Sequence, residues 1–156
     1  MMKASFVLLL PVLFVSSFLL SPLAAYEASV EYCDKKADYA VKVRGVDIDP
    51  YPIARGKPAT FNISANTGKS ISQGKLVIDV TYFIFHVYQE THDLCTKTSC
   101  PVSSGDFLLS HKQTLPGYTP PGSYTLQMKL LGEDNEVLTC VTFGFSIGFI
   151  SSVADI

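Results

Sequence analysis

The chain has 156 residues, of which 47% are hydrophobic and 17% are charged, and its formal net charge is -2 at pH 7. This composition excludes intrinsic disorder, which requires low hydrophobicity and high net charge. It also argues against a nucleic-acid partner, because proteins that bind nucleic acids present a basic surface to the phosphates. The length is that of one domain, since a chain of this size cannot build two separate hydrophobic cores.

The N-terminal segment has the layout of a secretory signal peptide, and we expect residues 1–25 to be removed. Lys3 is the only charged residue before Glu27, a long apolar stretch follows it, and two alanines close the segment. An uncleaved membrane anchor is the alternative, because the stretch approaches membrane-spanning length. A proline inside the stretch and the small residues at its end favour cleavage. The predicted mature domain is therefore 26–156, exported to the extracellular space or to a vacuolar or endolysosomal lumen.

The four cysteines all follow the predicted cleavage site, and an even number in a secreted chain implies disulfide bonds. Three pairings are possible. Cys95 and Cys100 bracket a short loop, which favours a local bond and leaves Cys33 to pair with Cys140. A rival interpretation is a metal site built from His86, His92, Cys95 and Cys100. That spacing matches no standard zinc motif, so we expect no metal and no other cofactor.

Hydrophobic alternation with period two, the pattern of a half-buried β-strand, runs through most of the chain. It is clearest over 59–66, 76–82 and 124–130. The phase of the alternation changes at Gly45, which predicts a β-bulge there. Six or seven strands, short turns and no convincing helix predict an all-β fold, an immunoglobulin-like antiparallel two-sheet sandwich.

One stretch departs from this pattern. Residues 82–88 are apolar on both faces of the predicted strand apart from His86, so this end must be covered on both sides or expose an apolar patch. The polar segment 89–104 is interpreted as a connection that carries the short cysteine loop. As the one titratable group in the apolar run, His86 is a hypothetical pH-sensitive gate, against the simpler interpretation of a solvent-facing side chain.

The residues predicted to face inward are large, often aromatic and almost free of polar groups. They form either a filled core or the wall of an apolar cavity, and composition does not decide between the two. For a cavity, the candidate lipid-binding residues are Phe61, Ile63, Ile78, Val80, Tyr82, Phe85, Val87, Tyr88, Tyr124, Leu126, Met128, Val141, Phe143 and Phe145.

Two further features concern catalysis and covalent modification. Asp106, Ser110 and His111 lie close in sequence, but neighbours along a strand alternate faces and do not make a triad. The motifs of common hydrolases and phosphate-binding enzymes are absent, so we expect no enzymatic activity. Asn62 begins an Asn-Ile-Ser glycosylation sequon on the predicted solvent face of its strand.

Several short motifs follow one another between about residues 30 and 150: Tyr32-Cys33-Asp34, Gly56-Lys57-Pro58 before Phe61-Asn62-Ile63-Ser64, Leu94-Cys95, Ser99-Cys100-Pro101-Val102, Pro121-Gly122-Ser123-Tyr124 and Leu138-Thr139-Cys140-Val141. In this order and spacing, the chain resembles the ML lipid-recognition domain family. That family includes Niemann-Pick type C-like sterol carriers and plant-type phosphatidylglycerol/phosphatidylinositol transfer proteins. The segment 47–55 lacks the cysteine of a third disulfide found in many animal carriers, as expected for the plant-type branch.

The resemblance implies a sandwich that holds a lipid between its sheets, with the Cys33–Cys140 and Cys95–Cys100 disulfides. It also implies a cavity mouth near the end of the 83–88 stretch and the Cys95–Cys100 loop. We interpret the protein as a monomeric lipid-binding and transfer protein that carries a sterol or phospholipid and contacts membrane surfaces transiently. The alternative is a secreted recognition module, such as a lipid-sensing co-receptor or a protein-binding domain. A filled core with an exposed aromatic patch would favour that module, whereas a cavity of at least roughly 300 Å³ favours the carrier.

Overall fold

A computed structural model describes residues 25–149, so all but the last residue of the predicted signal peptide lies outside the described part of the chain. The described part contains these strands and short 3-10 helices: β1 (Tyr26–Ala28), β2 (Val30–Tyr32), β3 (Val41–Asp49), β4 (Pro58–Thr67), β5 (Lys75–Tyr82), β6 (Phe85–Asp93), η1 (Leu94–Thr96), β7 (Gly105–Thr114), β8 (Gly122–Leu131), η2 (Glu133–Asn135) and β9 (Val137–Ile147). Within residues 25–149, no helix has the length and apolar character needed to cross a membrane.

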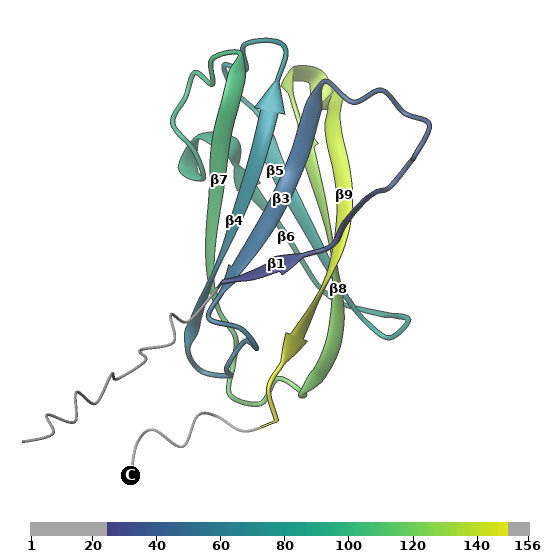
Figure 1. Cartoon of the computed structure of the whole chain (residues 1–156), viewed down its shortest axis with the longest axis vertical. Coiled ribbons are helices and arrows are strands. Elements are labelled where there is room, and N and C mark those ends of the chain that lie inside the picture. The colour runs from purple at the N-terminus through teal and green to yellow at the C-terminus, as the bar shows by residue number, and fades with distance from the viewer. Residues whose placement is uncertain (1–24, 150–156) are drawn as a thin grey trace, which may run out of the picture.

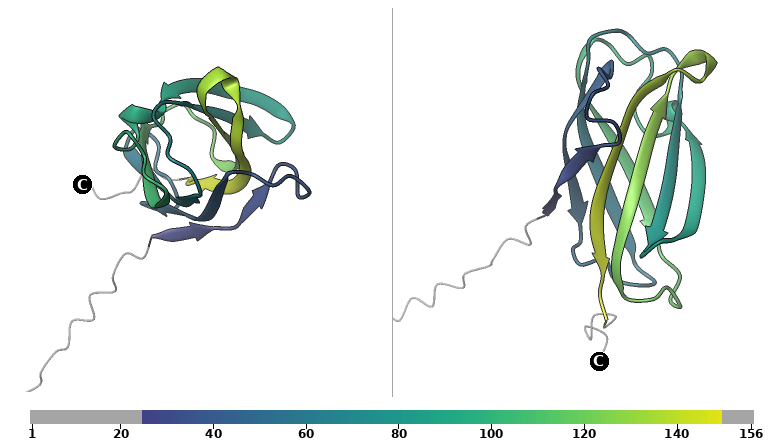
Figure 2. Two further views of the ribbon diagram at one scale, coloured as in Figure 1. Left: turned by 90° about the horizontal axis from the view of Figure 1, so that it is seen from above. Right: turned by 90° about the vertical axis from the view of Figure 1, so that its right-hand side faces the viewer.

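The strands form two antiparallel sheets that pack face to face (Figure 1). One sheet has four strands in the order β1-β3-β4-β7, and the other has five in the order β2-β9-β8-β5-β6. The short strands β1 and β2 follow each other in sequence but join different sheets, so the N-terminal segment crosses from one layer to the other. The two layers are also visible from above and from the side (Figure 2). The predicted all-β, two-sheet sandwich is confirmed.

Alternation sets which side chains enter the interior. Every second residue of β4 is buried, and its neighbours along the strand are half exposed or exposed. In β3 the register against β4 shifts between Val43 and Gly45, which confirms the predicted bulge. The shift changes the phase of the strand, and Val46 and Ile48 are therefore fully buried in the core.

The structure differs from the sequence prediction around residue 83. The chain turns at Phe83 and Ile84 instead of continuing as one strand, and β6 returns antiparallel to β5. β6 then runs to Asp93, through the first residues of the segment predicted to be a connection. The nine strands of the described residues also exceed the six or seven predicted, because β1 and β2 have three residues each and are too short for alternation to reveal.

Both disulfides predicted from the sequence are present. Cys33, directly after β2, is bonded to Cys140 in β9, and the backbone N–H of Cys33 also donates to the carbonyl of Cys140 at 3.0 Å. Cys95 is bonded to Cys100 across the turn that η1 begins. The sulfur ligands of the rival metal site are therefore used in a disulfide. The η1 loop lies at the opposite end of β6 from the β5–β6 turn (Figure 1).

Candidate functional site

The interior of the sandwich contains a cavity of about 440 Å³. Six strands and the connection between β7 and β8 contribute to its wall, which is mainly apolar. The lining residues are Phe61, Ile78, Val80, Tyr82, Val87, Tyr88, Glu90, His111, Gln113, Thr114, Leu115, Pro116, Tyr118, Thr119, Pro120, Tyr124, Leu126, Phe145 and Ile147.

Nine of the fourteen predicted lipid-binding residues line this cavity: Phe61, Ile78, Val80, Tyr82, Val87, Tyr88, Tyr124, Leu126 and Phe145. The other five lie elsewhere. Ile63, Met128, Val141 and Phe143 are at most 3% exposed, belong to the core and are not part of the lining. Phe85 is 65% exposed on β6 and is not part of the lining. A lipid-binding role for the nine remains a prediction.

A row of aromatic rings crosses the five-stranded sheet along one side of the cavity. The ring of Tyr124 stacks on Tyr82 with centroids 4.6 Å apart and on Phe145 at 5.5 Å. The hydroxyl of Tyr124 donates to the carbonyl of Pro120 at 2.7 Å, and that of Tyr82 donates to Pro121 at 3.3 Å. The same side chains therefore form the cavity wall and hold the connection between β7 and β8 in place.

Apolar side chains are exposed beside the cavity. Phe83 and Ile84 in the β5–β6 turn are 76% and 83% exposed, and Tyr118 in the β7–β8 connection is 86% exposed. Tyr118 also lines the cavity, so the cavity opens to solvent beside this connection. Phe83 directly follows the lining residue Tyr82. In β6, the register against β5 shifts at Val87, so Val87 and Tyr88 both reach the lining.

The expected position of the Cys95–Cys100 loop at the mouth is wrong, whereas the simpler interpretation of His86 as a solvent-facing side chain is confirmed. No residue of the Cys95–Cys100 loop lines the cavity, because that loop follows the far end of β6. His86 lies on the outer face of its sheet with 77% of its side chain exposed, and its Nδ1 atom is 2.8 Å from Oδ1 of Asp79. His86 does not line the cavity, which contradicts the hypothesis of a gate at this residue.

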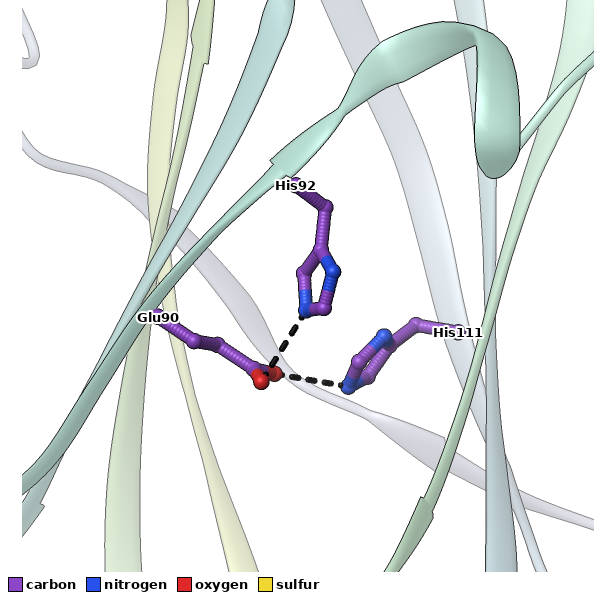
Figure 3. Close-up of side chains that lie close together, drawn as sticks. All are labelled: Glu90, His92 and His111. Carbon is purple, nitrogen blue, oxygen red and sulfur yellow. Dashed lines mark ion pairs between the residues drawn. The ribbon is translucent and has the colours of Figure 1, made fainter.

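A polar cluster that the sequence did not reveal interrupts the apolar wall (Figure 3). Nε2 of His111 in β7 is 3.0 Å from Oε1 of Glu90 in β6, and Nε2 of His92 is 3.0 Å from Oε2 of the same carboxylate. The hydroxyl of Tyr88 donates to Oε2 at 2.7 Å. Glu90 and His111 line the cavity directly. A carboxylate thus faces a mainly apolar cavity, with Tyr88, His92 and His111 as its polar neighbours.

The environment of the cluster shifts its protonation equilibria. Burial lowers the pKa of His111, and the positive charge of nearby Lys97 adds to this effect, against the opposing influence of the Glu90 carboxylate. Burial alone would raise the pKa of Glu90, but its polar neighbours His92 and Tyr88 and the imidazole charges outweigh burial and lower it. The hydrogen bond to Glu90 raises the pKa of Tyr88. At neutral pH the cluster therefore holds a carboxylate anion beside a neutral His111.

The residues considered for a catalytic triad point in different directions. Asp106 binds the Arg44 guanidinium on the outer surface, with Nη2 3.0 Å from Oδ1. The hydroxyl of Ser110 donates to Oδ1 of Asn62 at 2.9 Å, also on the outer face. The side chain of His111 faces the interior and is 6% exposed. Asn62 is half buried in the middle of β4, and its glycosylation remains a prediction.

Known proteins share this fold and sequence pattern. A sequence profile of the ML domain matches residues 27–147. The phosphatidylglycerol/phosphatidylinositol transfer protein of Aspergillus oryzae is 31% identical over 133 residues, which cover 78% of this chain and 76% of that protein.

Two solved structures have the same sandwich. A Niemann-Pick type C2 protein from Japanese carpenter ant superposes with a TM-score of 0.61 at 16% identity, covering 77% of this chain and 99% of the other. Chicken MD-1 complexed with lipid IVa superposes with a TM-score of 0.53 at 18% identity, covering 78% and 88%. At these identities the structures establish the fold alone, while the profile spans most of the sequence. The chain therefore belongs to the ML domain family.

Proposed function

We propose that the protein binds a lipid molecule, a sterol or a phospholipid, between its sheets and transfers it between membranes. The observation that carries this proposal is the cavity, whose volume of about 440 Å³ falls in the range of small-molecule sites, roughly 300–1,000 Å³. Its wall is mainly aliphatic and aromatic, and apolar surface removed from water contributes about 25 cal/mol per Å². The A. oryzae relative, named a phosphatidylglycerol/phosphatidylinositol transfer protein, supports the same function.

Transfer requires the cavity mouth to meet a membrane surface. The exposed side chains of Phe83, Ile84 and Tyr118 flank the mouth, and clustered exposed apolar residues are typical of interaction sites. We expect these side chains to enter the interfacial region of a bilayer while a lipid passes between membrane and cavity. No covalent step is needed for such an exchange.

The disulfides support a secretory destination. All four cysteines are bonded within residues 25–149, and disulfides persist in oxidising compartments. We therefore place the protein in the secretory pathway, with release to the extracellular space or delivery to a vacuolar or endolysosomal lumen.

The cavity proposal is tested by filling the space. Val80 lines the cavity, whereas Val77 lies on the opposite face of the same strand. We expect lipid to co-purify with the parent protein at close to one molecule per chain, measured by mass spectrometry of an organic extract. Val80→Trp should lose most of this lipid, and the matched Val77→Trp variant should keep it. A parent protein that carries no lipid and takes up neither sterol nor phospholipid would contradict the proposal.

A recognition module is the second candidate, and the exposed apolar turn is the observation that favours it. A vesicle assay separates the two functions. Movement of a labelled lipid from donor to acceptor vesicles, accelerated by the protein, supports transfer. Tight lipid binding without accelerated movement would instead assign the protein to recognition.

A further inference from the structure

The open side of the sandwich lies between two edge strands. β6 is the last strand of the five-stranded sheet and β7 is the last strand of the four-stranded sheet. Glu90 and His92 of β6 and His111 of β7 meet across this gap, and each offers a donor atom within 4.8 Å of the others (Figure 3). These three side chains are 15%, 27% and 6% exposed, so the cluster is largely withdrawn from solvent.

The protein itself does not satisfy all polar atoms of this cluster. Nε2 of His92 is buried 3.0 Å from the Glu90 carboxylate, but it is not aligned for a hydrogen bond. Buried polar atoms without partners are rare in native proteins, and an unseen ion or water is a common explanation.

We propose that Glu90, His92 and His111 form a binding site for a Zn²⁺ ion. Two imidazoles and one carboxylate are a donor set that zinc takes in sites with three protein ligands. Mg²⁺ and Ca²⁺ prefer oxygen ligands throughout, so this set discriminates against them. It shares only His92 with the metal site considered from the sequence, whose cysteines are bonded to each other.

The distances suit a small metal ion after a limited adjustment. Metal–ligand bonds of about 2.0–2.2 Å in a tetrahedral site separate donor atoms by roughly 3.3 Å. Each histidine Nε2 atom already lies 3.0 Å from its nearer carboxylate oxygen. The donor atoms of the two imidazoles are at most 4.8 Å apart, and rotation of the His92 side chain, the most exposed of the three, would shorten this distance.

The site is open to solvent at His92, whose side chain is 27% exposed. His92 also lines a solvent-open hollow of about 430 Å³, together with the acidic residues Asp93, Glu133 and Asp134. Glu90 and His111 face the lipid cavity, so the fourth position is open to water or to an oxygen atom of a bound ligand. A bound zinc ion would tie the two edge strands together across the open side.

Calorimetric titration tests the site on purified, lipid-free protein with intact disulfides. At pH 7.5 we expect one Zn²⁺ per chain, no comparable binding of Mg²⁺, and weaker zinc binding at pH 5.5 because protons compete for the imidazoles. Glu90→Gln and His92→Gln should each weaken zinc binding at least ~10-fold, the smallest loss seen even for outer partners of metal ligands. His86→Gln, which removes an exposed histidine from the same strand, is the matched control and should bind as the parent does.

X-ray absorption at the zinc edge tests the parent protein without any substitution. We expect two imidazole nitrogens and oxygen ligands around the ion, and sulfur should be absent. Failure of the parent to bind zinc, or a shell without two imidazoles, would overturn the proposal. So would parent-like affinity in folded Glu90→Gln and His92→Gln variants, or an equal loss in His86→Gln. None of these results depends on whether the protein transfers lipid.

Discussion

Inward and outward side chains alternate throughout the sandwich, but one half of its interior is packed and the other half is hollow. In one half, Met128 and Val141 are at most 1% exposed and the space between the sheets is filled. Two residues along β8, Leu126 faces the cavity, as does Val80 on the neighbouring strand. The hollow half reaches the edge strand β6, where Tyr88 lies at the opening and does not fill it. Alternation therefore determines which side chains face inward, and the neighbouring strands determine whether the interior is filled.

The largest expected effect concerns the disulfide that anchors the packed half. Cys33 and Cys140 are 107 residues apart, whereas Cys95 and Cys100 are 5 apart. In the chain-entropy model, the double serine variant of the first pair loses about 5 kcal/mol of stability, and that of the second loses about 2 kcal/mol. Urea unfolding of lipid-free protein measures both. Equal losses would mean that loop length does not determine how much each disulfide stabilises the fold.

A pair of alanine substitutions on β8 compares the two halves directly. Met128→Ala should cost about 2–5 kcal/mol, since it empties a filled region. Leu126→Ala should cost less, because part of its surface already faces open space, but it should change lipid uptake more. Urea unfolding and binding of a fluorescent lipid give the two readouts. The contrast between the halves fails if the substitutions have the same effects on both.

Acid should act on the hollow half through His111. Its pKa is lowered in the fold, so below about pH 6.5 the unfolded chain binds a proton that the folded chain does not. Stability therefore falls as the pH drops from 7 to 5, whereas the contribution of Glu90, with its lowered pKa, is lost only at more acidic pH. Thermal unfolding with a chelator present should show a shallower pH dependence for His111→Gln than for the parent. His86→Gln is the control, and the same slope in all three would refute this assignment.

The smallest effect on stability is expected at the β5–β6 turn. Phe83 has a positive φ of 55° and an exposed side chain, and asparagine tolerates this backbone conformation better. Phe83→Asn should change stability by no more than about 0.5 kcal/mol and should slow lipid transfer between vesicles. Val137→Asn, at an exposed apolar position in the first residue of β9, should leave transfer unchanged. Transfer that is equally fast in Phe83→Asn would exclude the turn from membrane contact.

The sequence predicts the strands β3, β4, β5 and β8 well, because each has a polar and an apolar face. It misses the turn at Phe83 because neither Phe83 nor Ile84 is a typical turn residue, and a positive φ at phenylalanine has no sequence signal. The apolar stretch there was expected to be covered on both sides or to expose a patch. The structure has the exposed patch.

The polar cluster shows a different limit. Alternation continues through β6, so Tyr88, Glu90 and His92 share the inward face, but the inward residues are polar and the segment resembled a connection. Residues two apart in a strand share a face whatever their polarity, so a strand prediction through this segment would have placed Glu90 and His92 on the same face. Their meeting with His111 depends on how the two sheets approach each other. That distance is a tertiary property, which local alternation does not encode.

Tyr82 and Tyr124 connect the wall of the cavity to the backbone of the β7–β8 connection. Both rings line the cavity, and their hydroxyls donate to the carbonyls of two successive prolines, Pro120 and Pro121. A ligand too large for the cavity would displace both rings and, through their hydrogen bonds, the backbone at Pro120 and Pro121. A large ligand would therefore displace the β7–β8 connection beside the opening through which it leaves, whereas a small ligand would not.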